Sequence, residues 1–309
     1  MTEPVTIACI GFWSEYDHAF LEHAQSAHFR TVVVNPFQQL GKTTNPKYLP
    51  KPLRTALLKR VATKLIQQHA NNYILLQDER LLIDALLNID QKLSASILMR
   101  NSLIESEKVR DRIPAIKQRG YSIWSFDAED CQRHGFHKYD QFISKIGTYE
   151  NTPIKIDFGF IGKNKGRKEQ LESLRQKLQD MGFRCEIDLR VGARKKGTGK
   201  VDLPYAEYLQ EICKARCMID IVQEQQAGIT LRPLEAAIYQ RKLMTNSIRV
   251  KDLSFYNKNN IFVIGHDSWD RLQGFMEMSF VEPGEETLSP YMTEAMLSKV
   301  VQESEFEEV

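Results

Sequence analysis

The alternation of two kinds of apolar segment restricts the fold of this chain more than any other feature. Short segments rich in β-branched residues alternate with longer segments whose apolar residues recur at helical spacing. This order is typical of strand–helix units in a parallel sheet. The first series of expected strands consists of VTIACIG, RTVVVNP, NYILLQ, ASILMR and YSIWSF. The helices expected between them cover residues 15–26, 52–69, 78–87 and 105–119.

The periodicity lapses in KIGTYENTPIKI, where glycine, asparagine and proline in close succession indicate a linker. A second series follows, with expected strands IDFGFIG, FRCEIDL, CMIDIV, KLMTN and NIFVI and expected helices over 166–181, 205–213 and 231–239. We therefore predict an α/β protein of two consecutive Rossmann-like doubly wound domains, 1–150 and 151–309. A return of the last helix to the first domain is compatible with this division. The carboxyl ends of both sheets would face a central cleft, where open α/β sheets bind ligands.

Composition favours a soluble protein with reduced thiols. The chain is 42% apolar and 27% charged, which is the balance of a globular domain. Its five cysteines are odd in number and scattered, which argues against a disulfide framework. The nearest pair, Cys213 and Cys217, has no histidine close by, so a metal is the less favoured interpretation there. The N-terminus shows neither a signal peptide nor a membrane-spanning segment, and we expect a cytoplasmic protein.

The segment FGFIGKNKGRKEQLESLRQKL indicates an anion site in the second domain. The expected strand ends at Gly162, the following loop carries Lys163 and Lys165, and Arg167 falls in the first turn of the next helix. Free backbone N–H groups, the positive end of the helix dipole and three cations together suit a phosphate. The plainer alternative is a solvated basic helix start, since Lys and Arg are common on exposed faces.

A second site of this kind is indicated by AGITLRPLEAAIYQRKLMTNS. A helix is expected from Leu231, with Thr230 as its N-cap. The free amides from Gly228 onward and the Arg232 side chain would hold a diphosphate, and the Glu235 carboxylate would accept ribose hydroxyls. The alternative is a surface ion pair between Arg232 and Glu235, which would contribute about 0.2–0.5 kcal/mol.

The order of the two segments in the chain supports a single shared site. They follow the first and the third expected strands of the second domain. If these strands lie near the centre of the sheet, both helix starts face the same edge. Together they would suit a nucleotide diphosphate.

The residues CMIDIVQEQQAGITLRPLEAAIYQRKLMTN most resemble the lipopolysaccharide core biosynthesis glycosyltransferases of Gram-negative bacteria. The second half as a whole resembles the donor-binding domain of type B glycosyltransferases (GT-B), and IWSFDAEDCQRHGF in the first half is similar to the same group. The resemblance implies a nucleotide-sugar donor held by the second domain and a glycan acceptor held by the first. It also implies no metal and no further cofactor, because cations and helix starts stabilise the leaving diphosphate.

The match to the broad retaining group of such enzymes is incomplete. In that group two glutamates eight positions apart contact the sugar and the ribose. Glu235 matches the second glutamate, but Ala227 stands at the position of the first, and Thr230 stands where a glycine is usual. This departure leaves open both the sugar contact and the choice between retention and inversion.

For an inverting reaction, the resemblance implies a general base from the first domain that deprotonates the acceptor hydroxyl. The loop after VTIACIG carries Glu15, Asp17 and His18 at the expected carboxyl edge of the first sheet. Of these we select Asp17 as the catalytic base. The alternative for each acidic residue is an ordinary helix start, because carboxylates favour that end of the helix dipole.

A basic amphipathic helix is expected at 52–69, within a stretch from His23 to Gln77 that contains no acidic residue. Such a helix can lie on the anionic inner face of a cytoplasmic membrane and meet a lipid-linked saccharide acceptor there. The more common alternative is a helix that packs on its own sheet. A nucleic-acid partner is not expected. The cationic residues of this helix are Arg54, Lys59, Arg60 and Lys64.

Three functions compete for this chain. The leading hypothesis is a hexosyltransferase-type glycosyltransferase that acts on a lipopolysaccharide core or a surface polysaccharide. A nucleotide-sugar epimerase of the same architecture would consume the donor with no acceptor present. A non-catalytic nucleotide-binding subunit of a polysaccharide assembly complex is the third, and the alanine at position 227 is its main argument.

Overall fold

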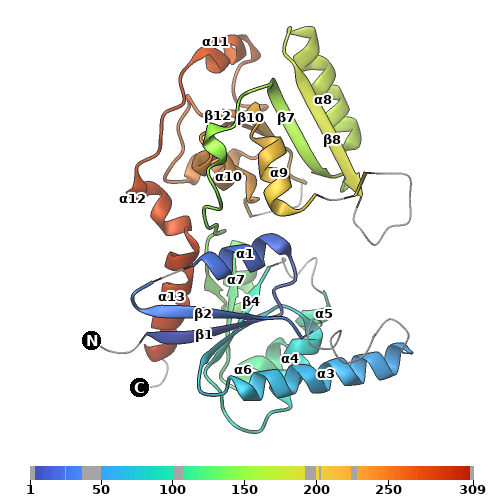
Figure 1. The fold of residues 1–309 in the computed structure, drawn as a ribbon, viewed down its shortest axis with the longest axis vertical. Helices are drawn as coiled ribbons and strands as arrows, with labels where there is room; N and C mark the ends of the chain where they lie inside the picture. The colour runs from blue at the N-terminus through green and yellow to red at the C-terminus, as the bar shows by residue number, and fades with distance from the viewer. Residues whose placement is uncertain are drawn as a thin grey trace. The chain divides into compact units, whose positions relative to one another are not determined.

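A computed structural model describes residues 4–24, 26–36, 50–100, 107–191, 200–201, 203–223 and 228–306. The chain divides into unit 1, formed by Met1–Asp140 with Met292–Val309, and unit 2, formed by Gln141–Tyr291. Each unit has its own six-stranded parallel sheet with helices between the strands (Figure 1). The predicted α/β fold of two consecutive Rossmann-like domains is thereby confirmed. The predicted cleft between the domains stays a prediction.

The sheet of unit 1 has the strand order β2-β1-β3-β4-β5-β6. The chain runs from β1 to β2 on one side and then to β3 on the other, so the switch point lies between β1 and β3. All the strands expected in this half are present. The two-residue strand β6 is not among the predicted ones, because two residues carry no periodicity. The strands are β1 Val5–Ile10, β2 Phe29–Val34, β3 Tyr73–Gln77, β4 Ala95–Met99, β5 Ser122–Ser125 and β6 His137–Lys138.

Helices cover both faces of this sheet (Figure 1), with α3, α4 and α6 on one face and α1 and α7 on the other. The first group encloses a core cluster that includes Leu65 of α3 and Leu82 of α4, together with Ile74 and Ile97 from the strands. Burial of such aliphatic side chains is the main force that fixes these layers. The helices are α1 Glu15–His23, α3 Lys51–Gln68, α4 Arg80–Leu87, α5 Glu107–Arg110, α6 Ile113–Gln118 and α7 Ala128–His134.

The single helix predicted over 105–119 is wrong in one respect. Within the described part of this range, the chain forms two short helices, α5 and α6, separated at Asp111 and Arg112. Pro114 stands in the first turn of α6. Proline lacks a backbone N–H and clashes with the preceding turn, so it starts a helix but does not continue one.

The sheet of unit 2 has the strand order β12-β11-β10-β7-β8-β9, and all its pairings are parallel. This is the order of the dinucleotide-binding Rossmann fold, with its switch point between β7 and β10. The two strands predicted to precede the anion-binding segments are therefore neighbours at the centre of the sheet. The strands are β7 Ile156–Lys163, β8 Cys185–Val191, β9 Lys200–Val201, β10 Ala215–Asp220, β11 Lys242–Thr245 and β12 Ile261–Val263.

Amphipathic helices cover the sheet of unit 2. In α8, Leu171, Leu174 and Leu178 are buried at three- and four-residue spacing and pack against Phe158 and Phe160 of β7. The two short helices α11 and α12 have no counterpart among the predicted ones. The helices are α8 Lys168–Asp180, α9 Tyr205–Ile212, α10 Arg232–Ile238, α11 Leu272–Glu277 and α12 Glu285–Leu288.

The boundary between the units falls after Asp140, whereas the prediction placed it at residue 150. The predicted linker is held to unit 2 by two side chains. The Tyr239 hydroxyl bonds both the N–H and the carbonyl of Ile146, at 3.0 Å each. The Arg241 guanidinium donates to the carbonyls of Glu150 and Thr152. These bonds fix residues that sequence periodicity alone leaves unassigned.

The last helix, α13 (Thr293–Phe306), belongs to unit 1. The Lys299 ammonium donates to the carbonyl of Lys138 at 2.8 Å and lies 5.8 Å from the centre of the Trp124 ring. No helix in the described ranges is long and apolar enough to cross a membrane. All five cysteines are free thiols.

Candidate functional site at the centre of the second sheet

The carboxyl ends of β7 and β10 lie side by side at the switch point of unit 2. β7 leads into α8 and β10 leads toward α10, so the segments after the two strands start from one edge of the sheet. In open parallel sheets, ligands bind in the crevice at this position. The structure therefore brings together the two segments that the sequence marks as anion-binding.

The loop after β7 is a tight turn with two residues in the left-handed region. Lys165 has φ 44° and Gly166 has φ 81°. The carbonyl of Lys165 accepts a hydrogen bond of 2.9 Å from Gln223, which follows β10. Lys163 and Lys165 are exposed, and α8 begins at Lys168, two residues after the predicted start. The loop thus presents cations and the amino end of a 13-residue helix at the carboxyl edge of the sheet.

Arg167 connects this loop to the strand beside it. Its guanidinium donates to the carbonyl of Ile221, just beyond β10, and to the carbonyl of Lys163 at the end of β7. It also lies 4.9 Å from the centre of the Phe160 ring. Burial and the nearby charge of Arg232 lower the pKa of Arg167 from its usual value. The charge of Asp220 opposes this shift.

Arg232 occupies the other side of the same crevice. Its guanidinium donates to the carbonyl of Ile161 at 2.8 Å and to that of Ile219 at 2.9 Å, which joins the ends of β7 and β10. It lies 4.7 Å from the Phe160 ring centre. A Cβ at Gly162 would come within 3.2 Å of the Phe160 ring, so glycine there keeps the ring against which the guanidinium packs free of a tight contact.

Two guanidinium groups thus share the ring of Phe160, and one carboxylate lies beneath them. Asp220 is 2% exposed, lies 3.9 Å from Arg232, and accepts bonds from the hydroxyls of Thr230 and Thr245. Burial raises its pKa, and the Arg232 charge opposes that shift. Glu235 is a second buried carboxylate whose charge acts on Arg232, so the positive charge that remains for a ligand at the edge of the sheet comes from the exposed Lys163 and Lys165. An anionic ligand would balance the charge of these lysines.

The start of α10 differs from the prediction. The helix begins at Arg232 with Leu231 as N-cap, so the N-cap assignment of Thr230 is wrong. The Thr230 hydroxyl donates to Asp220 at 3.1 Å and accepts from the Arg232 N–H at 3.3 Å. Threonine is held there by the buried carboxylate, a long-range contact that local capping rules do not include. Gly228 is the first described residue of this segment, and Ala227 lies outside the described ranges.

Glu235 is 3% exposed and points into the interior of unit 2. Its carboxylate accepts a bond of 3.0 Å from the Tyr205 hydroxyl and one of 2.7 Å from the Tyr208 hydroxyl, both on α9. No ion pair joins Glu235 to Arg232 in the described structure, so the surface-pair alternative is wrong. The ribose contact of Glu235 stays a prediction, and its bonds favour a role in fixing α9 against α10. Alanine at this position would remove the carboxylate that accepts from both tyrosine hydroxyls.

The stability of the protein should depend on pH through Glu235. Burial raises the pKa of this carboxyl above its ordinary value of 4.5. Between 4.5 and the raised pKa, the folded state binds more protons than the unfolded state. The free energy of unfolding of the parent should therefore fall as pH rises through this interval. The free energy of unfolding of Glu235→Gln should fall less steeply. Urea denaturation of the parent and of Glu235→Gln at a series of pH values measures how steeply each free energy changes. Equal slopes would contradict a raised pKa of the Glu235 carboxyl.

Asp17, the predicted catalytic base, lies in unit 1 and is 1% exposed. Its carboxylate pairs with Arg100 at 2.6 Å and accepts a bond of 2.5 Å from Ser14, the N-cap of α1. Burial alone would lower the pKa of Arg100, but the Asp17 charge raises it above the usual value. Tyr139 accepts a further bond from this guanidinium at 3.3 Å. The geometry favours a structural ion pair, and a role of Asp17 in proton transfer stays a prediction.

The basic helix packs on its own sheet through one part only. Leu58, Ala62, Leu65 and Ile66 of α3 are buried, whereas Leu53 is 60% exposed. The first turn of this helix therefore faces solvent. Arg60 and Lys64 are exposed, and Arg54 and Lys59 are half-buried.

Several residues of these networks are not among the predicted site residues. Phe160 gives no signal, because it looks like any core residue of an apolar strand. Asp220 within CMIDIV and Arg100 after ASILM do carry one, since an ionisable group in a buried strand needs a partner. Tyr205 and Tyr208 are three positions apart at a helix start, and a buried tyrosine hydroxyl needs a hydrogen-bond partner. Among the described residues, no group of three or more His, Cys, Asp or Glu is placed to hold a metal ion.

Comparison with known proteins gives similarity in fold alone. No family model and no curated protein matches the sequence. The UDP-GlcNAc 2-epimerase from Methanocaldococcus jannaschii aligns with a TM-score of 0.52 and 11% identity, over 98% of this chain and 99% of that one. A glycosyltransferase involved in avilamycin A biosynthesis aligns with a TM-score of 0.50 and 10% identity, over 98% and 97% of the two chains. The chain has the two-Rossmann-domain fold that GT-B glycosyltransferases and UDP-GlcNAc 2-epimerases share.

Proposed function

We propose that the protein is a glycosyltransferase that moves a hexose from a nucleotide diphosphate donor to a lipopolysaccharide core or surface polysaccharide. The observation that carries this proposal is the approach of Arg167 and Arg232 to one ring, at 4.9 and 4.7 Å, at the switch point of unit 2. The nucleotide-sugar chemistry is suggested by the fold, and the acceptor class by the resemblance of CMIDIVQEQQAGITLRPLEAAIYQRKLMTN.

A diphosphate suits this place better than a single carboxylate. A guanidinium carries five N–H groups, and the bonds of Arg167 and Arg232 to strand carbonyls leave several of them for a ligand. Arginine binds phosphate oxygens through two parallel bonds, so two arginines match two phosphates. Lys163 and Lys165 and the amino end of α8 add charge on the same side.

In the transfer step these residues act on the leaving group. As the bond between the sugar and the diphosphate breaks, negative charge grows on the diphosphate, and the arginines and helix amides stabilise it. Cations fixed by carbonyls and by the Phe160 ring need little rearrangement during the step. The same set of charges makes a metal unnecessary for this part of the reaction, which we propose to be metal-independent.

The acceptor is proposed to bind unit 1 at the inner face of the cytoplasmic membrane. The exposed cations Arg60 and Lys64 and the exposed Leu53 lie on α3, the helix whose first turns leave the core. Basic residues attract anionic headgroups, and exposed apolar side chains enter the interface. A protein that docks in this way reaches a lipid-linked saccharide without a membrane-spanning segment.

Charge reversal on α3 tests membrane docking. Arg60→Glu with Lys64→Glu should weaken binding to vesicles that contain phosphatidylserine by at least about thirtyfold, since each of the two lost cations contributes about 1 kcal/mol near an anionic surface. Sedimentation with vesicles measures the affinity. Reversal of Lys258 and Lys251, exposed lysines of unit 2, serves as the control. Equal binding by the α3 variant and the control would exclude α3 as the docking surface.

The epimerase is the second candidate, because the fold is also that of a UDP-GlcNAc 2-epimerase. Incubation with each nucleotide sugar alone separates the two reactions. A transferase should leave the donor intact over the time in which an epimerase would convert it to its isomer. Addition of lipopolysaccharide core acceptors should then release nucleoside diphosphate and lengthen the glycan. Isomer formation without acceptor would overturn the transferase proposal.

A non-catalytic binding subunit would give a third result. Nucleotide binding with no turnover of any donor, with or without acceptor, would favour it. Turnover that disappears in Arg167→Ala would exclude it, because that variant changes the proposed diphosphate contact.

A further inference from the structure

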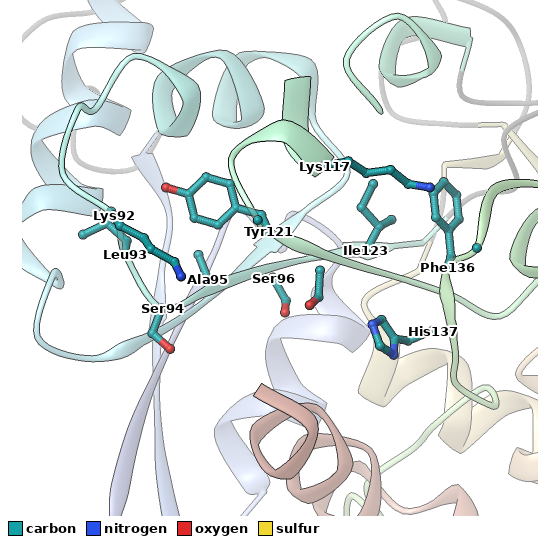
Figure 2. Close-up of a pocket in the computed structure, with 13 residues that line it drawn as sticks. Lys92, Leu93, Ser94, Ala95, Ser96, Lys117, Tyr121, Ile123, Phe136 and His137 are labelled. Atoms are coloured by element: carbon teal, nitrogen blue, oxygen red, sulfur yellow. The ribbon is translucent and has the colours of Figure 1, made fainter. Parts of the chain in front are cut away.

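Unit 1 contains a pocket at the amino-terminal edge of its sheet (Figure 2), with a volume of about 410 Å³. Its walls come from the residues before and at the start of three adjacent strands, β4, β5 and β6. All three strands run parallel, so their starts meet at one edge. The proposed transfer chemistry uses the carboxyl edges of the sheets, and this pocket lies at the opposite edge of its sheet.

The pocket is lined by cations and contains no carboxylate among its 13 lining residues. Figure 2 shows Lys92 and Lys117 on opposite sides of the pocket, with Ser96 between them. Lys92 is exposed and pairs with no described residue. The Lys117 ammonium donates to the carbonyl of His134, which leaves two of its three N–H groups for another acceptor.

The strand starts that line the pocket are more polar than parallel strands usually are. Such strands are covered on both faces and read as nearly continuous apolar runs. Here Ser96 of β4 is in register with Ser122 of β5, and His137 of β6 is in register with Trp124. The Ser96 hydroxyl is buried and bonds the Tyr73 hydroxyl. Ser94 adds a further hydroxyl at the start of β4. The Ser94 hydroxyl beside Lys92, with Lys117 opposite, suits a ligand with anionic oxygens.

Two glycines keep the wall of the pocket open. Gly120 and Gly135 have φ values of 71° and 63°, in the left-handed region. A Cβ at Gly120 would meet no atom within 4 Å, so this backbone faces open space. A Cβ at Gly135 would lie 3.8 Å from the Lys117 ammonium, an ordinary contact distance, so this backbone lies beside that cation.

We propose that this pocket is a second ligand site, which binds a small molecule through a phosphate or carboxylate group held by Lys92 and Lys117. The positive lining selects an anion, and the Ser94 hydroxyl donates to its oxygens. The pocket draws no residue from unit 2 and none from the carboxyl edge of unit 1. Binding here is therefore separable from nucleotide binding at Arg167 and Arg232.

The test is a titration of the ¹⁵N-labelled full chain with inorganic phosphate in one arm and with succinate in the other, observed by TROSY spectra. The amide resonances of Ser94, Gly120 and Gly135 should shift and saturate in at least one arm. Phosphate alone would assign a phosphorylated ligand, and succinate alone a carboxylate.

Lys92→Glu should lower the affinity for the anion that gives the saturating shift at least about tenfold, because it reverses one of the two charges that hold the anion. Ser94→Ala, which removes a hydroxyl without changing charge, should weaken it less. Lys155→Glu in unit 2 is the charge-matched control and should bind as the parent does. The proposal is overturned if neither probe shifts these amides, or if Lys92→Glu and Lys155→Glu bind equally.

Discussion

Replacement of Asp17 by asparagine should lower the free energy of unfolding by about 3 kcal/mol. The carboxylate pairs with Arg100 at 2.6 Å, and the two side chains are 2% and 6% exposed. Removal of one partner of a buried pair leaves the other charge without compensation, which costs about 3–5 kcal/mol. Denaturation in urea, followed by circular dichroism, measures the change.

Two comparisons separate this structural role from catalysis. Asp157→Asn removes the partner of Arg184, whose side chain is 68% exposed, and should change stability far less. The double variant Asp17→Leu with Arg100→Met should recover much of the loss, since an apolar pair replaces both charges. If Asp17→Asn kept full stability but lost turnover, the ion-pair account would be wrong and the original assignment as general base would gain support.

Replacement of Arg232 by leucine should have the second large effect, a loss of about 3 kcal/mol in the free energy of unfolding. The guanidinium joins the carbonyls of Ile161 and Ile219 across β7 and β10 and neutralises the buried Asp220. Without it, Asp220 remains in the interior with only hydroxyl partners. Urea denaturation of the parent and of Arg232→Leu measures the difference in the free energy of unfolding.

The matched control is Arg184→Leu, an exposed arginine of the same unit that also pairs with an aspartate. Its stability should remain close to that of the parent. Arg232→Lys should fall between the two, because lysine keeps the charge but cannot reach both carbonyls with a planar fork. A variant Arg232→Leu as stable as Arg184→Leu would show that Arg232 does not hold the strands together.

The sequence predicts the fold well because the fold depends on periodicity. All ten expected strands occur, and β7 and β10 are neighbours as the donor-site prediction required. The errors fall where a single residue or a distant contact decides. Pro114 divides one predicted helix, and Tyr239 with Arg241 assigns the predicted linker to unit 2.

The site is less predictable, because its residues act through contacts between distant segments. Sequence spacing placed Arg167 and Arg232 correctly after their strands, but it could not show that both approach Phe160. Spacing also paired Glu235 with Arg232, whereas the carboxylate turns to two tyrosines of α9. The orientation of a helix about its axis decides such partners, and one residue of rotation changes them.

Calorimetry of nucleoside diphosphate binding to Arg167→Ala tests the central claim most directly. The claim is that Arg167 and Arg232 hold one diphosphate at the switch point of unit 2. The nucleoside diphosphate that the parent binds most tightly should lose at least about tenfold in affinity, since a hydrogen bond to a charged group contributes about 1.5–3 kcal/mol. Arg175→Ala, on the exposed face of the same helix, should bind as the parent does. Equal affinity of the two variants, or a parent that binds no nucleoside diphosphate, would contradict the account.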